Sequence, residues 1–132
     1  MRFVIKCCIL FIVLSHVLVA SGDIIKSDNG AWAISFASAL DEIELHKITD
    51  VEFNLLTADA RPATGLKLKV EGGMPGHGHG FPTSPYIEEK EPGLYALRGI
   101  SFSMRGAWLL VIKVESDNNT SDQFTLPLYI KP

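Results

Sequence analysis

The residues best suited to chemistry lie in one glycine-rich segment, residues 72–82, which reads Gly-Gly-Met-Pro-Gly-His-Gly-His-Gly-Phe-Pro. The segment holds two of the four histidines of the chain and five glycines in eleven residues. So much glycine favours a shaped loop over a helix or strand, because glycine loses the most backbone entropy on ordering. His77 and His79 are separated by one glycine and can point at a single ion, and Met74 adds a thioether. Imidazole and thioether together suit copper better than magnesium or calcium.

The same segment is also typical of a structural turn. Loop histidines often donate a ring N–H to a backbone carbonyl, and Pro75 and Pro82 restrict the backbone at the two ends of the loop. A His-x-His pair is a weaker metal motif than a pair of Cys-x-x-Cys sequences. Both interpretations, ligation and turn structure, therefore stay open at the level of the sequence.

The first 22 residues have the pattern of an export signal. Arg2 and Lys6 accompany an apolar run that ends at Ala20, and Ala-Ser-Gly at 20–22 forms a small-residue cleavage site. We therefore expect a signal peptide over residues 1–22 and an exported domain over residues 23–132, periplasmic or extracellular. An uncleaved membrane anchor is the alternative, although the run is shorter than the about 20 apolar residues of a typical span. Cys7 and Cys8, the two cysteines of the chain, both fall in this segment.

The composition of the predicted mature domain narrows the function classes. About 110 residues suit one domain with one core. Its 10 Lys and Arg against 15 Asp and Glu leave a net charge of −5, so nucleic acid is not an expected partner. The domain has no cysteine, no Gly-x-Ser-x-Gly elbow and no His-Glu-x-x-His helix motif. We expect a binding module with no catalytic residues, and a monomer, rather than an enzyme.

The elements that must position the loop are short strands separated by turns. Apolar and polar residues alternate in 32–36, 51–55 and 66–70, and strands are also expected at 86–89, 94–97, 108–114 and 123–130. Pro92-Gly93 suits the centre of a hairpin turn, and Pro127 confines the last strand to an edge or a bulge. The apolar run at 108–114 is typical of a central strand covered on both sides, and Trp32 and Trp108 are expected in the core. About seven strands predict an all-β, immunoglobulin-like β-sandwich.

Three groups of residues in the mature chain resemble the YtkA-like domain family, which is related to the FixH-type proteins. They are the Met-Pro-Gly-His-Gly-His-Gly-Phe-Pro-Thr loop at 74–83, Gly-Leu-Tyr at 93–95, and Phe-Ser-Met-Arg-Gly-Ala-Trp at 102–108. The likeness covers roughly residues 50–130, with Arg105 where the family often has proline. It implies an immunoglobulin-like domain, exported or membrane-anchored, of a family associated with copper handling or with the assembly of respiratory oxidases.

The resemblance adds Met104 to the candidate ligands. Met74, His77, His79 and Met104 would form a mixed nitrogen and sulfur set suited to Cu(I), provided that the loop after Val70 and the start of the Trp108 strand lie at the same end. The alternative for Met104 is that it fills a gap in the core. We therefore expect an exported module that binds copper for delivery or storage. The alternative is a non-metal interaction domain that assists the assembly of a membrane or respiratory complex, and a membrane protein is the expected partner.

Overall fold

The computed structural model describes residues 22–131, so the predicted signal peptide lies outside the described residues except for Gly22. The described chain is all-β. Its strands are β1 (Ile25–Lys26), β2 (Trp32–Phe36), β3 (Thr49–Thr57), β4 (Lys67–Met74), β5 (His79–Gly80), β6 (Tyr86–Glu91), β7 (Leu94–Ile100), β8 (Gly106–Glu115) and β9 (Ser121–Ile130). Two single-turn 3₁₀ helices, η1 (Leu40–Glu42) and η2 (Pro75–His77), complete it. Neither of these has the length or apolar character to cross a membrane.

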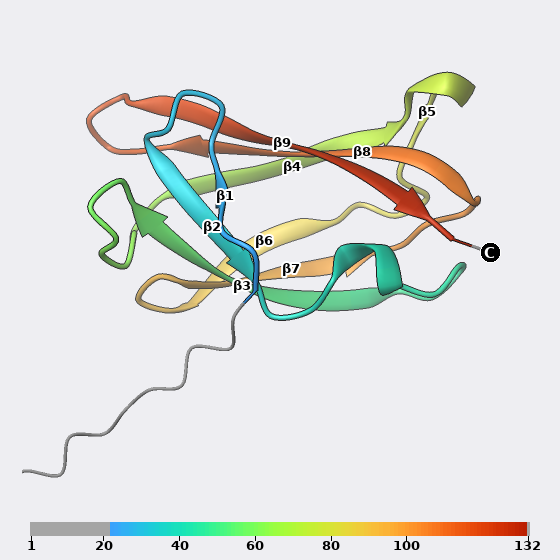
Figure 1. Cartoon of the computed structure of the whole chain (residues 1–132), viewed down its shortest axis with the longest axis horizontal. Coiled ribbons are helices and arrows are strands. Elements are labelled where there is room, and N and C mark those ends of the chain that lie inside the picture. Colours follow the sequence, from blue (N-terminus) through green and yellow to red (C-terminus); the bar gives the residue numbers. More distant parts are fainter. Residues whose placement is uncertain (1–21, 132) are drawn as a thin grey trace, which may run out of the picture.

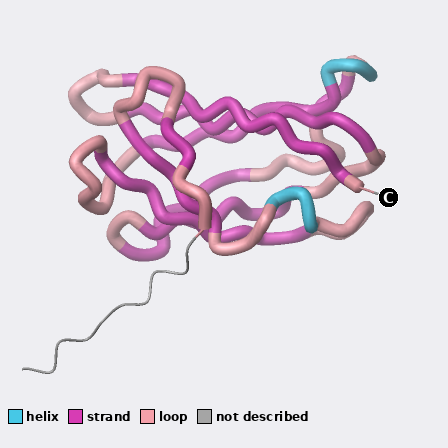
Figure 2. The backbone as a smooth tube through the Cα atoms, in the orientation of Figure 1, coloured by secondary structure: helices cyan, strands magenta, loops and turns pink. Residues whose placement is uncertain are grey.

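The strands form two antiparallel sheets that pack face to face as a β-sandwich (Figures 1 and 2). One sheet has the order β1-β2-β3-β7-β6 and the other has the order β5-β4-β8-β9. Seven of these strands have five residues or more, which confirms the number expected from the alternating segments. The two remaining strands, β1 and β5, have two residues each and extend one edge of each sheet.

The core lies between the two sheets and contains the side chains that alternate inward. Trp32 and Trp108 are both buried there, as the sequence predicts. Strand β8 is central in its sheet, but only one of its faces is fully buried, so the expected cover on both sides is wrong. The outward residues Leu109 and Val111 are half-buried opposite Gly73 and Glu71 of β4. Neighbouring side chains of the same sheet shield the outer face in part, and the apolar run needs no second layer.

Local turn chemistry explains two further features. Pro92-Gly93 joins β6 to β7 as a two-residue hairpin, in which Gly93 has a φ of +79°, as the third position of such a turn requires. Strand β9 pairs only with β8, so Pro127 lies on an edge strand, the usual place for a proline within a sheet. Both features were predicted from the sequence.

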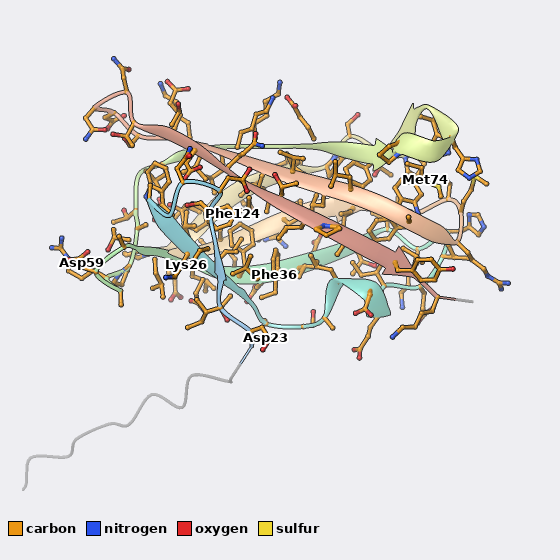
Figure 3. The ribbon with its side chains drawn as sticks, turned by 45° about the horizontal axis from the view of Figure 1, so that its top comes forward. Asp23, Lys26, Phe36, Asp59, Met74 and Phe124 are labelled. Atoms are coloured by element: carbon orange, nitrogen blue, oxygen red, sulfur yellow. The ribbon has the colours of Figure 1, made fainter. Side chains whose placement is uncertain are left out.

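The two ends of the sandwich carry different loops. Strand pairs Thr49–Ile100, Tyr86–Arg98, Gly73–Leu109 and Gly106–Ile130 bring the loops 43–48, 75–85 and 101–105 to one end. We call this the histidine end. The turns at 58–66, 92–93 and 116–120 lie at the opposite end, and Figure 3 shows Met74 at the first end and Asp59 at the second. The antiparallel topology therefore gathers the glycine-rich loop and the loop that contains Met104.

Candidate metal centre

A tight hairpin between β4 and β5 positions both histidines of the glycine-rich segment. Met74 and His79 are directly paired across the two strands, and η2 forms the connection. The N–H of Gly78 donates to the carbonyl oxygen of Met74 at 3.0 Å, and Gly78 adopts the left-handed conformation that closes the turn. Side chains directly opposite each other on paired strands share one face. The hairpin thus places the Met74 thioether and the His79 imidazole on the same side.

Glycine is required where β5 closes onto β4. Gly73 has a φ of +154°, and a Cβ atom at this position would lie 2.2 Å from the carbonyl oxygen of His79. No side chain fits such a distance without moving the strand. Gly73 therefore allows the close backbone approach that sets the position of His79.

The two imidazole rings are exposed and close together. The ring centroids of His77 and His79 lie 6.0 Å apart. A ring nitrogen binds a first-row metal at about 2 Å, so two rings that share one ion have centroids roughly 5–6 Å apart. The observed centroid separation of 6.0 Å therefore lies in the range that shared ligation requires.

The ring of His79 is held by two contacts. Its Nδ1 lies 3.0 Å from the carbonyl oxygen of Gly80, and its ring meets the indole of Trp108 edge-on at a centroid distance of 5.6 Å. The hydrogen bond is the one expected for a structural loop histidine. It is also the usual arrangement of a ligating histidine, in which one nitrogen donates to a carbonyl and the other, here Nε2, faces the metal.

An aromatic cluster forms the floor beneath the hairpin. The ring of Phe81 stacks on Trp108 at 5.7 Å with an interplanar angle of 6°, and Phe102 packs against Trp108 at 5.1 Å. The indole N–H of Trp108 donates to the carbonyl oxygen of Met104 at 2.9 Å. Trp108 therefore contacts both the histidine loop and the loop before β8, and it holds the two loops at one end as the sequence analysis required.

The two methionines have different environments. Met74 is 3% exposed, and its terminal methyl group lies beneath Gly106, 3.4 Å from where a Cβ of that residue would be. Met104 is 40% exposed, so it does not fill a gap in the core, contrary to the alternative considered for it. Of the two thioethers, Met74 lies on the interior side of the hairpin and Met104 is the more accessible to solvent.

The segment that contains both histidines is uncharged, while the exposed Arg105 lies on the neighbouring loop 101–105. Residues 72–86 contain no Asp, Glu, Lys or Arg. Met74 and His79 line a shallow hollow of about 240 Å³, together with Leu109 and the backbone of the hairpin. Within residues 22–131, no three His, Cys, Asp or Glu side chains gather as a metal-binding group. Any ion bound by the described residues at this end would depend on two imidazoles and neutral sulfur.

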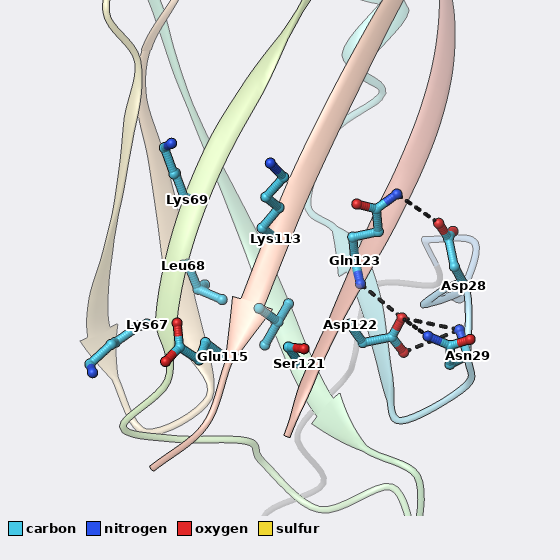
Figure 4. Close-up of a pocket in the computed structure, with 11 residues that line it drawn as sticks. Asp28, Asn29, Lys67, Leu68, Lys69, Lys113, Glu115, Ser121, Asp122 and Gln123 are labelled. Atoms are coloured by element: carbon cyan, nitrogen blue, oxygen red, sulfur yellow. Dashed lines mark hydrogen bonds between the residues drawn. The ribbon is translucent and has the colours of Figure 1, made fainter. Parts of the chain in front are cut away.

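A larger hollow, of about 630 Å³, lies elsewhere, over β4, β8 and β9 (Figure 4). Several of its polar groups are paired with one another or with the backbone. The carboxylate of Asp122 accepts hydrogen bonds from the N–H groups of Asn29, Ala31 and Gln123. Burial raises the pKa of Asp122, but the Ser27 hydroxyl and these backbone donors outweigh it and hold the pKa below its ordinary value. This carboxylate fastens the β1–β2 loop to β9, so we assign the hollow a structural role.

Sequence reasoning identified the histidines but missed how the site is built. It did not find the pairing of Met74 with His79, nor Phe81 and Trp108 as the floor. The signal available was the four-residue Pro-Gly-His-Gly turn between Met74 and His79, which is short enough to close a hairpin.

Comparison with known proteins returned no relative. No family model matches the chain, and neither the curated proteins nor the solved structures include a significant match.

Proposed function

We propose that this protein is an exported β-sandwich module that binds one copper ion through His77 and His79, with Met74 and Met104 as softer ligands, for copper storage or delivery. It is a binding module rather than an enzyme. The resemblance of residues 74–83, 93–95 and 102–108 to the YtkA-like family supports this role and suggests a membrane protein or respiratory complex as the recipient.

We further propose that the sandwich is of the immunoglobulin type. In the constant-type arrangement, four strands in the order A-B-E-D face three in the order C-F-G. Taking β2, β3, β4, β6, β7, β8 and β9 as A to G reproduces both orders, β2-β3-β7-β6 and β4-β8-β9. The short strands β1 and β5 are then additions at the edges.

One observation carries the copper proposal. The cross-strand pair of Met74 and His79 presents a thioether and an imidazole on one face, and the exposed ring of His77 lies 6.0 Å from that of His79. A soft sulfur ligand beside neutral imidazoles favours copper, whereas calcium and magnesium select oxygen ligands. The absence of charge in residues 72–86 also disfavours the hard cations.

The test is a copper titration of the purified exported protein, followed by fluorescence and calorimetry. Trp108 contacts His79, so Cu²⁺ bound there quenches its emission. Trp32 is the other tryptophan of the chain, and Trp32→Phe leaves Trp108 as the single reporter. We expect saturable quenching, and we expect the double variant His77→Ala, His79→Ala to weaken binding by about a hundredfold, about 2.7 kcal/mol.

His46 supplies the matched control. It is exposed at the same end, where its N–H donates to the carbonyl oxygen of Phe102, and its φ is +61°. Asparagine tolerates this conformation, so His46→Asn removes an imidazole without straining the loop. If the double variant bound copper as tightly as the parent, the copper site would not be at His77 and His79. The interaction-domain function would then be the remaining proposal.

The thioethers are tested by oxidation state. Met74→Leu conserves the volume of a buried side chain, and Met104→Leu does so at the exposed position. Both should weaken Cu(I) more than Cu(II), because sulfur is the softer ligand. An equal effect on both ions would remove the methionines from the ligand set.

Export follows from the N-terminal sequence. Residues 1–22 have the charged start, apolar run and small-residue site of a signal peptide. We propose cleavage near Ser21 or Asp23 and release to the periplasm or the extracellular space. Mass spectrometry of the exported protein checks this, and an intact Met1 would indicate an uncleaved membrane anchor.

The second candidate is a non-metal interaction domain that assists the assembly of a membrane or respiratory complex. The observation that favours it is the apolar character of the histidine end. Four of the five large apolar side chains that are exposed among the described residues are at or beside this end: Ile48, Tyr86, Met104 and Tyr129. Clustered exposed apolar groups mark protein contacts more often than isolated ones do.

A further inference from the structure

We propose that Cu(II) at the histidine end bridges two copies of this chain when copper is limiting, with His77 and His79 of each copy bound to one shared ion and the imidazoles of the second copy in the places of the two thioethers. The inference rests on the proposed copper function and names the partner of that same site. It concerns the metal-bound state, and the metal-free chain remains monomeric.

The first reason is the number of ligands on one copy. Among residues 22–131, no third His, Cys, Asp or Glu joins the two imidazoles in a metal-binding group. Met74 lies on the interior side of the hairpin, 3% exposed. First-row metals bound by imidazole usually hold four ligands. The two remaining places are those of the soft thioethers Met74 and Met104, which imidazoles of a second copy can take around Cu(II).

The second reason is the shape of the hairpin. Figure 1 shows η2 and β5 at one corner of the sandwich, where they rise above β8 and β9. Both histidine rings are exposed on this projection. A second copy can therefore approach the rings at this corner.

The third reason is charge. The mature chain has a net charge of −5, so two copies repel one another over most of their surface. Residues 72–86 are a run of fifteen residues without a charged side chain, in a protein in which 20% of residues are charged. Contact through this segment brings no like charges together, and neutral imidazoles from two copies add none.

The fourth reason is the exposed apolar residues beside the loop. Tyr86 is 57% exposed, Met104 is 40% exposed, and each faces solvent at the histidine end. In a two-fold dimer the same patch contacts itself, so a small apolar patch is covered on both copies at once. A copper ion on the two-fold axis would fix the geometry of the dimer, and this apolar patch would add contact area beside it.

The experiment measures mass and copper content together. The exported, purified protein is titrated with copper(II) sulfate and followed by sedimentation velocity and by metal analysis of each species. We expect a monomer without copper, a dimer that saturates at one copper per two chains, and dissociation on addition of EDTA. Copper in excess should return the protein to monomers, because each chain then holds its own ion.

Three variants separate the contributions. His77→Gln with His79→Gln should abolish the dimer, whereas His46→Asn should behave as the parent. Tyr86→Ser should weaken dimerisation by about fivefold or more, because it removes part of the apolar patch but none of the proposed copper ligands.

The outcomes distinguish this inference from the function on which it rests. One copper per chain in a monomer at every ratio would overturn the bridge and leave the copper function standing. No copper bound by the parent would overturn both. A copper-dependent dimer that persists in the double histidine variant would also overturn the bridge, since other residues would then form it.

Discussion

Trp108 connects the stability of the protein to its candidate site. The indole is 2% exposed, it packs against Phe81 and Phe102, and it also contacts the exposed ring of His79. A core residue that reaches the floor of a surface site limits how far the site can move. His79 is thereby partly ordered by the core, while His77, at the tip of the turn, is not.

This difference predicts unequal costs of substitution. Trp108→Ala should lower the free energy of unfolding by about 3–5 kcal/mol, as for other large aromatic side chains removed from cores. His77→Ala should change it by less than about 0.5 kcal/mol without metal, because the side chain is exposed. Urea unfolding of the metal-free protein measures both. If both variants lost a similar amount of unfolding free energy, His77 would have a structural role in the loop, and its assignment as a copper ligand would be weakened.

The β4–β5 hairpin brings the candidate ligands of the glycine-rich segment together in one place. Its four-residue connection pairs Met74 with His79 and leaves His77 at the apex. Glycine at the closing positions is what allows the two backbones to approach. The geometry of the site therefore depends on backbone approach as much as on the identity of the ligands.

A pair of glycine variants tests this dependence. Gly73→Ala should destabilise the protein by about 2 kcal/mol or more and weaken copper binding, because the new Cβ meets the His79 carbonyl oxygen and its φ of +154° is strained. Gly76→Ala is the control, since no atom lies within 4 Å of its Cβ position. Thermal unfolding and copper titration of both variants give the comparison. Equal behaviour of the two would mean that the close approach does not position His79.

At the scale of the whole fold, five carboxyl groups of residues 22–131 have a pKa below its ordinary value: Asp50, Asp59, Glu71, Glu89 and Asp122. The clearest is Glu71, on the outer face of β4. Hydrogen bonds from Lys113 and then Lys69 lower the pKa of this carboxyl from 4.5 to about 2. A depressed pKa in the folded state means that the carboxylate stabilises the fold above its unfolded pKa, and that this contribution is lost as pH falls.

We therefore expect acid to destabilise the protein progressively between about pH 4.5 and pH 2. Glu71→Gln should flatten part of this decline, because the amide has no proton to take up. Glu42→Gln is the control, since Glu42 is exposed and has no ion pair among the described residues. Chemical unfolding across this pH range measures the effect. A decline equally steep in the parent and in Glu71→Gln would contradict it.

The sequence by itself determined the local features of this protein. The expectation that glycine excludes strand from residues 72–82 is wrong in part, because β4 extends to Met74 and β5 covers His79–Gly80, where glycine lets the two backbones approach closely. Alternation placed the strands, Pro92-Gly93 placed a hairpin, and Pro127 indicated an edge. Each of these depends on the conformational preferences of a few adjacent residues, which the sequence states directly.

Only the tertiary structure decided which strands pair and what lies beneath the loop. The burial of Met74, the exposure of Met104 and the contact of Trp108 with His79 follow from pairings between residues far apart in the chain. The single buried face of β8 has the same origin, because an apolar run does not reveal whether a second layer or neighbouring side chains cover its outer face. Such contacts arise from close packing of segments that are distant in the sequence. The alternation of apolar and polar residues within one strand does not identify the strand with which it pairs.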